Sequence, residues 1–202
     1  MKALLKYNNK NIFSYTLLLL TSLFLFSCQK VEIIENVVFD YKQFKTITFL
    51  SSEIEVIDDY KPRYENPYLD HLIDISPSNR LIDWLKNNIK GLGAENKLVI
   101  IVKDASIIGS EVDNEEKIAG ILKKPKEYKY ELNYQINFNI LDDNDIIIAE
   151  TKIKVDRSTT SSKSISLAER DKILDDLIYN GLIDLVDKTE ISTKKYLNQY
   201  IL

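Results

Sequence analysis

Apolar and polar residues alternate most clearly between residues 128 and 155. Apolar side chains occupy every second position from Tyr128 to Ile140, and the same period resumes from Ile147 to Val155. Between the two stretches lies the acidic run Asp142-Asp143-Asn144-Asp145. Residues two apart share one face of a strand, and Asp and Asn favour turns. We therefore predict one long antiparallel hairpin with an apolar face and a wet face.

Two other segments repeat their apolar residues at helical spacing. The first follows Ser76-Pro77, an N-cap and a first-turn proline, and its apolar stripe ends at Gly91 and Gly93. The second runs from Ile173 to Val186 and follows Ser166-Leu167-Ala168-Glu169, which has the form of a capping box. The sequence thus predicts a first helix after Ser76 and a long amphipathic helix after Ser166.

Two more strands are expected before the hairpin. Thr46 to Asp59 is rich in β-branched residues, but its apolar positions change parity, so we predict a bulge near Ser51-Ser52. Lys97 to Ile108 is an almost continuous aliphatic run of the kind that is buried on both faces inside a sheet. Tyr60 to Ile75 and the Ser/Thr-rich Ser158 to Ser164 are predicted as loops.

The expected order is therefore strand, helix, strand, strand, strand, helix. This order fits an α/β (α+β) two-layer sandwich with a mixed four-stranded sheet and both helices on one face. The other face of the sheet is expected to be polar and partly open. The apolar C-terminal residues from Tyr196 to Leu202 would dock on the fold or serve a partner.

The N-terminus has the pattern of an export signal. Three lysines precede an uncharged apolar run from Ile12 to Phe26, which is short for a membrane span. Leu25-Phe26-Ser27-Cys28 resembles a bacterial lipobox, and Cys28 is the only cysteine of the chain. We expect residues 1–27 to be a lipoprotein signal peptide, Cys28 to carry acyl chains such as palmitate, 28–44 to be a tether, and 45–202 to be one domain. The alternatives are an uncleaved anchor helix or an ordinary signal peptide.

The amino-acid composition excludes several classes of site and function. The 202 residues contain one His and one Cys, which excludes a disulfide framework and any Cys-rich metal site. Removing residues 1–27 moves the formal net charge from −4 to −7, and such an acidic domain is a poor nucleic-acid binder. Gln29 is not the Asp that would resemble an inner-membrane retention signal, so the outer membrane, on its periplasmic face, is the expected location. The inner membrane or a single-membrane cell surface is the alternative.

Catalytic chemistry has weak support. Asp70-His71 with a serine would permit a relay, but no G-x-S-x-G elbow accompanies it. Asp142, Asp143 and Asp145 lack the spacing of a calcium loop. We expect no catalytic residue, no metal and no cofactor, and we expect that the protein is not an enzyme.

Several motifs carry a resemblance over nearly all of the mature chain. They are Tyr68-Leu69-Asp70-His71, Ser76-Pro77, Trp84, Val102-Lys103-Asp104-Ala105-Ser106-Ile107 and Ser166-Leu167-Ala168-Glu169-Arg170-Asp171. With these motifs the chain resembles an uncharacterised family of Gram-negative envelope lipoproteins. The element order also looks like that of the accessory lipoproteins of lipopolysaccharide assembly and of ABC-type lipid transport. Neither resemblance supplies a catalytic residue.

Three hypotheses follow. The first is a lipid-anchored, non-enzymatic accessory protein that docks on an envelope assembly or transport complex through a sheet edge, the open sheet face or the C-terminal segment. The alternative is a periplasmic module that holds a lipid or glycolipid between the sheet and its helices, where Tyr128, Tyr130 and Tyr134 would line a groove. A hydrolase is the third. Candidate contacts to a partner or ligand are Tyr68, His71, Trp84 and Tyr200.

Overall fold

The long hairpin is the centre of the fold. A computed structural model, which describes residues 38–113 and 126–202, pairs β5 (Lys126–Leu141) with β6 (Ile147–Ser162) in antiparallel register. The turn between them is held by Asp142, whose Oδ1 accepts hydrogen bonds from the backbone N–H groups of Asn144 and Ile146. These hydrogen bonds lower the pKa of the Asp142 carboxyl. The acidic run therefore has a structural role as a turn.

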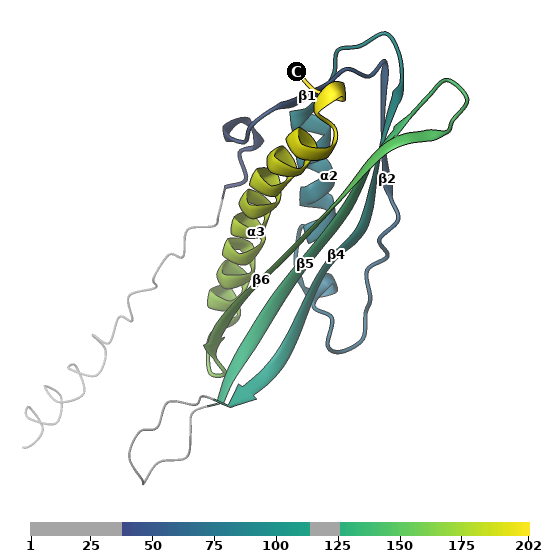
Figure 1. Ribbon diagram of the computed structural model, residues 1–202. Helices are drawn as coiled ribbons and strands as arrows, with labels where there is room; N and C mark the ends of the chain where they lie inside the picture. The colour runs from purple at the N-terminus through teal and green to yellow at the C-terminus, as the bar shows by residue number, and fades with distance from the viewer. Residues whose placement is uncertain (1–37, 114–125) are drawn as a thin grey trace, which may run out of the picture. The chain divides into compact units, whose positions relative to one another are not determined.

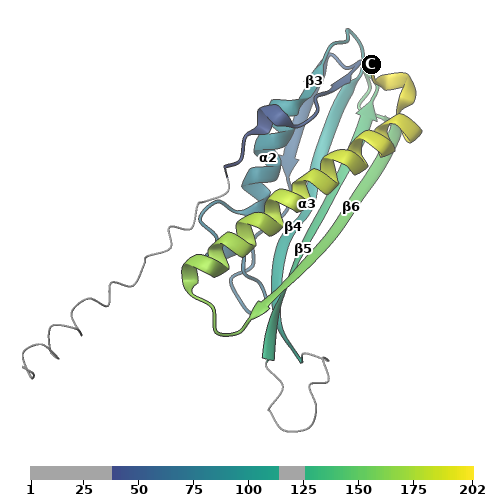
Figure 2. The same cartoon turned by 90° about the vertical axis from the view of Figure 1, so that its left-hand side faces the viewer.

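The hairpin belongs to a mixed sheet of four strands in the order β2-β4-β5-β6. β4 (Lys97–Asp113) pairs antiparallel with β5, and β2 (Glu53–Asp58) pairs parallel with β4. Figure 1 shows α2 (Pro77–Asn88) and α3 (Leu167–Tyr196) beside one face of this sheet, and Figure 2 shows the same layer from the helix side. The predicted two-layer α/β sandwich is confirmed.

Both helices begin at the caps that the sequence indicated. The Ser76 hydroxyl accepts a hydrogen bond from the N–H of Asn79, and Pro77 occupies the first turn. The Ser166 hydroxyl accepts from the N–H of Glu169, whose carboxylate accepts from the N–H of Ser166 in return. This capping box satisfies backbone groups that a free helix end leaves without partners.

The core lies between the helices and one face of the sheet. α3 packs mainly on β6 and β5, while α2 packs on β4 and β2. Gly181 permits the closest approach, because a Cβ there would lie 2.2 Å from the Leu132 Cδ2 atom. The largest fully buried side chains come from β1, α2, β4 and β5 and are Trp84, Tyr134, Phe49, Phe138, Leu81, Leu85, Leu98, Ile100, Ile107, Leu132, Ile136 and Ile140.

The first predicted strand is divided between two sheets. β1 (Ile47–Phe49) pairs parallel with β3 (Ile89–Gly91), outside the four-stranded sheet, and the chain then crosses into β2. The predicted bulge near Ser51-Ser52 is therefore wrong, because the change of parity marks a change of sheet. The two segments approach so closely that a Cβ at Gly93 would lie 2.4 Å from the Leu50 carbonyl carbon.

Two other expectations need correction. The predicted loop from Ser158 to Ser164 is mostly strand, because β6 continues to Ser162 and pairs with β5 as far as Glu127. The sheet face away from the helices is polar along β5 but not wet throughout. Asn139 is buried there, and its Oδ1 atom and that of Asn137 have no hydrogen-bond partner among the described residues.

The segment before β1 packs on the helices from Phe39 onward. The ring of Phe39 meets that of Tyr179 edge to face, with centroids 5.4 Å apart. The Asn88 side-chain amide donates hydrogen bonds to the carbonyl oxygens of Tyr41 and Phe44. Cys28 and the predicted signal peptide lie outside the described residues. No helix in the ranges 38–113 and 126–202 has the length and hydropathy that crossing a membrane requires.

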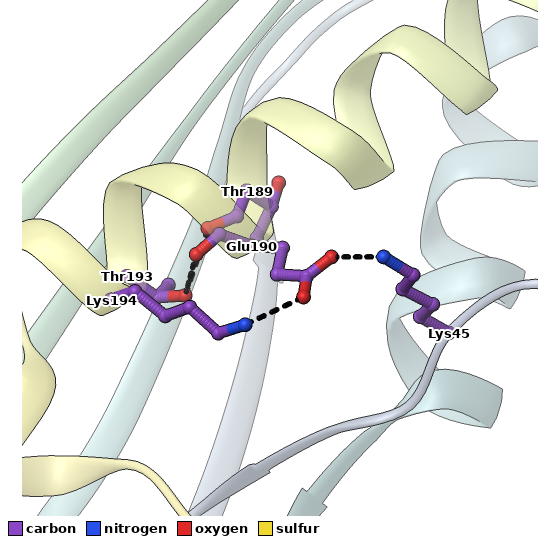
Figure 3. Close-up of polar contacts among 5 residues, drawn as sticks. All are labelled: Lys45, Thr189, Glu190, Thr193 and Lys194. Carbon is purple, nitrogen blue, oxygen red and sulfur yellow. Dashed lines mark hydrogen bonds and ion pairs between the residues drawn. The ribbon is translucent and has the colours of Figure 1, made fainter.

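An ion pair fastens the same segment to the last turns of α3. Figure 3 shows the Glu190 carboxylate between the ammonium groups of Lys194 and Lys45, at 2.7 and 2.5 Å. Hydrogen bonds from Lys194 and Lys45 lower the pKa of Glu190 to about 2. The pair therefore connects the approach to β1 with the helix that covers β6.

This pair predicts a specific pH dependence for Glu190→Gln. A carboxyl group whose pKa is lower in the folded state stabilises the fold above its unfolded pKa, here near 4.5, and loses that contribution as the pH falls through about 2. At pH 6 the variant should melt below the wild type, and the difference should shrink between pH 4.5 and pH 2. Thermal unfolding over this range measures it. Glu95→Gln, at an exposed glutamate, should show no such difference at any pH, and a constant difference for Glu190→Gln would contradict the assignment.

Candidate functional site

The two edges of the four-stranded sheet differ. β2 covers only the first part of β4, and Pro67, Tyr68 and Leu69 continue along the rest of it. The N–H of Leu69 donates to the Ile107 carbonyl, and the N–H of Gly109 donates to the Pro67 carbonyl, both at 2.8 Å. The segment predicted as a surface loop therefore closes one edge of the sheet.

Asp70 completes this closure. Its side chain is buried, and Oδ1 accepts a hydrogen bond of 2.7 Å from the N–H of Ile107. Oδ2 accepts a hydrogen bond from the Tyr60 hydroxyl. Burial and this hydrogen bond to Asp70 raise the pKa of Tyr60, so the phenol stays a donor. The carboxylate thus satisfies a strand N–H that would otherwise be buried without a partner.

The sequence placed Asp70 and His71 in a conceivable catalytic relay. Both Asp70 oxygens are already engaged, and the exposed His71 ring instead lies 5.8 Å from the ring of Tyr64. The His71 side chain forms no hydrogen bond among the described residues. The structure therefore does not bring the elements of the relay together.

The other predicted contact residues lie apart from one another. Tyr68 is half-buried, and the Arg63 guanidinium lies 4.5 Å from the centroid of the Tyr68 ring. Trp84 has 0% of its surface exposed, so it packs the core and offers no surface to a ligand or partner in this structure. Tyr200 is half-buried, and its carbonyl accepts a hydrogen bond from the N–H of Leu50. The C-terminal segment docks on β1.

The other edge of the sheet is formed by β6 and has no neighbouring strand among the described residues. Lys188 on α3 donates a hydrogen bond to the Lys154 carbonyl, which therefore points away from β5. Because the backbone of an antiparallel strand alternates, the even-numbered residues from Glu150 to Thr160 share this outward orientation. β6 thus presents a row of backbone donors and acceptors at the edge of the sheet, of which the Lys154 carbonyl is bound by Lys188.

Exposed isoleucines lie where this edge begins. Ile146, Ile147 and Ile148 follow the hairpin turn and are between 44% and 59% exposed. Scattered exposed apolar residues are normal, but three in succession on an unpaired edge favour association with another chain. Sequence reasoning placed Ile147 and Ile148 on opposite faces and missed the cluster. The sequence does contain a signal for this cluster, because three consecutive isoleucines interrupt the alternation of apolar and polar residues along the strand.

A separate cavity of about 880 Å³ lies beside His71, between α2 and α3. Its most deeply placed charge is Arg80, whose guanidinium lies 3.6 Å from the Phe39 ring centroid and 2.7 Å from Asp175. Burial raises the pKa of Asp175, and Arg80 opposes that rise. These contacts hold the cavity wall together. No group of three His, Cys, Asp or Glu side chains within the described ranges is placed to hold a metal ion.

Three solved structures are similar to the chain. A minor lipoprotein from Acinetobacter baumannii has 11% identity and a TM-score of 0.40, over 73% of this chain and 92% of its own. The rare lipoprotein B from Shewanella oneidensis has 15% identity and a TM-score of 0.33, over 71% and 96%. A homolog of neuraminyllactose-binding hemagglutinin from Helicobacter pylori has 10% identity and a TM-score of 0.34, over 78% and 92%.

Two of these three are bacterial lipoproteins. All three TM-scores are below 0.5, so the likeness carries no functional argument. No protein-family model matches the chain. No curated protein matches it in sequence.

Closure of the β4 edge by Asp70 can be tested by substitution. Asp70→Ala leaves the Ile107 N–H and the Tyr60 hydroxyl buried without an acceptor, which should cost about 3 kcal/mol of unfolding free energy. Asp70→Asn keeps one acceptor and should cost less. Urea unfolding measures both, with Asp74→Ala, an exposed carboxylate of the same loop, as the control. Equal unfolding midpoints for Asp70→Ala and Asp74→Ala would contradict this role.

Proposed function

We propose that the protein is a lipid-anchored, non-enzymatic accessory protein of the cell envelope that docks on an assembly or transport complex through the free edge of β6. The observation that carries this proposal is the contrast between the two sheet edges. One edge is closed by β2, residues 67–69 and the Asp70 carboxylate. The other exposes a strand of 16 residues.

A free edge of this length is suited to strand addition by a partner. Backbone hydrogen bonds supply affinity in such complexes, and side chains at alternate positions supply specificity. The outward residues of β6 include the ion pairs Glu150–Lys152 and Lys154–Asp156. Charges on an edge strand discourage indiscriminate pairing, so they would restrict the edge to a complementary partner. The exposed isoleucines at the turn would then be covered in the complex.

The non-enzymatic part of the proposal is supported by how the candidate catalytic groups are used. Both Asp70 oxygens accept structural hydrogen bonds, and Asp142 holds the hairpin turn. Asp104 likewise accepts a hydrogen bond from the N–H of Ser106, within β4 next to a register shift. Each of these carboxylates has a role in the backbone structure.

Docking through β6 predicts a crosslinking pattern in cells. A photo-activated amino acid at Thr160, exposed on the free edge, should form an adduct with one envelope protein that mass spectrometry can identify. The same amino acid at Lys172, exposed on α3, should not form this adduct. Equal adducts from both positions, or none from Thr160, would contradict docking through the edge.

Proline substitutions distinguish the edge from the fold. Ser158 directs its N–H outward, so Ser158→Pro should remove one docking donor, leave the melting temperature nearly unchanged and abolish the Thr160 adduct. Thr159 lies opposite Tyr130 with its N–H directed into the ladder, so Thr159→Pro should unfold the edge. A folded Ser158→Pro protein that keeps the full adduct would argue against strand addition.

The lipid anchor is tested at Cys28. Replacing the only thiol of the chain by Ala should prevent attachment of labelled fatty acid, since the lipobox provides no other acceptor. Gel fluorescence of a clickable fatty acid measures this. Labelling of the variant, or absence of label on the wild type, would contradict the anchor without touching the docking proposal.

A further inference from the structure

A second depression lies at the opposite end of β5 from the hairpin turn. It has a volume of about 390 Å³, within the range of small-molecule sites, and it lies between the sheet and the first turns of α3. It adjoins the larger cavity, with which it shares Leu72 and Leu174. We call it the α3 groove.

Its lining is mostly apolar and aromatic. Tyr128 and Tyr130 form the sheet side, with their ring centroids 5.2 Å apart. Further along β5, beneath the body of α3, the residues on the same face are fully buried, such as Leu132 and Ile136. Tyrosine has an apolar ring and a polar end, which suits the boundary between an apolar ligand and water.

The charge of the lining differs from that of the rest of the molecule. Lys163 and Arg170 line the α3 groove, and no described carboxylate lines it, although the chain as a whole carries a net charge of −4. Outside the lining, Lys163 pairs with Glu111 and Arg170 pairs with Asp171 at 3.0 Å. The adjoining cavity shows the reverse pattern, with four aspartates and one arginine in its wall. Lysine has three N–H donors and arginine has five, so each side chain can hold an anionic head in addition to its carboxylate partner.

Two of the leucines that line the groove are exposed to solvent. Leu167 opens α3 and is 70% exposed, and Leu72 reaches the groove from the Asp70 loop and is also exposed. An exposed leucine at a first helical turn contributes little to folding. Both would gain burial from an acyl chain in the groove.

We propose that the α3 groove binds the acyl chain of a single-chain anionic amphiphile, with Lys163 and Arg170 holding its head. The chain would lie against Tyr128, Tyr130 and the two leucines. This site meets β6 only at its last residue, Ser162, and its occupation does not depend on docking.

The test uses the full-length protein reconstituted in phosphatidylcholine nanodiscs. Photoactivatable palmitate and photoactivatable lysophosphatidic acid are added in separate arms, and mass spectrometry locates the labelled residues. Either probe should label peptides containing Tyr128 or Leu167, and unlabelled palmitate should compete. The arm with the stronger labelling identifies a carboxylate or a phosphate as the preferred head. An uncharged photoactivatable monoacylglycerol should label about tenfold less, as expected for loss of charge-assisted hydrogen bonds.

The variants Leu167→Glu and Ile191→Glu form a matched pair on α3. Both replace an exposed apolar residue, 70% and 67% exposed, by the same acid, and only Leu167 lines the groove. Leu167→Glu should abolish labelling while keeping the melting temperature, and Ile191→Glu should label like the wild type. The proposal would be overturned if the label spread over the surface, if it survived Leu167→Glu, or if the uncharged probe labelled equally well. Crosslinks between two copies would also overturn it. If this labelling experiment fails, the crosslinking test of docking through β6 is unaffected.

Discussion

The hydrogen bond from the N–H of Ile107 to the Asp70 carboxylate fastens the loop that closes the part of the sheet edge that β2 does not reach. β4 has 17 residues, and the short β2 pairs with only part of it. The rest of its outer side would expose backbone groups if the loop did not cover it. By fixing the loop through Ile107 and Tyr60, Asp70 leaves β6 as the uncovered edge of the described sheet.

This asymmetry connects the fold to the proposed function. A monomer that left both edges free would present two templates for association, and one closed edge limits docking to one side. α3 adds to the selectivity, because Lys188 reaches the Lys154 carbonyl and Arg157 pairs with Asp184 at 2.6 Å. The α3 groove lies at the far end of the same helix from the Glu190 ion pairs.

Local sequence patterns predicted most helices and strands, whereas the order of the strands in the sheet depends on long-range pairing and could not be predicted. The alternation from Tyr128 to Val155 and the caps at Ser76 and Ser166 depend on neighbours in sequence, so they could be recognised directly. The strand order depends on contacts between distant segments, so the free edge of β6 had no sequence signal. The change of parity after Phe49 was visible, but choosing between a bulge and a change of sheet required the pairing of β1 with β3.

The candidate site shows the same limit. Asp70 stood beside the only histidine, so sequence proximity suggested chemistry, whereas its partners Tyr60 and Ile107 are 10 and 37 residues away. Trp84 lies off the apolar stripe of its helix, yet it is completely buried. The cluster Ile146-Ile147-Ile148 could have been found from the broken alternation. Its significance as part of an edge required the sheet.

Residue-resolved hydrogen exchange can test directly whether a partner docks on the edge of β6. The amides of the even-numbered residues from Glu150 to Thr160 are compared in the purified protein and in the protein extracted from its envelope with partners retained. If a partner docks on β6, these amides should exchange rapidly in the purified protein and be strongly protected in the complex. The Ile107 amide, held by Asp70, should be protected in both. Rapid exchange along β6 in the complex as well would contradict the claim that this edge is the docking surface.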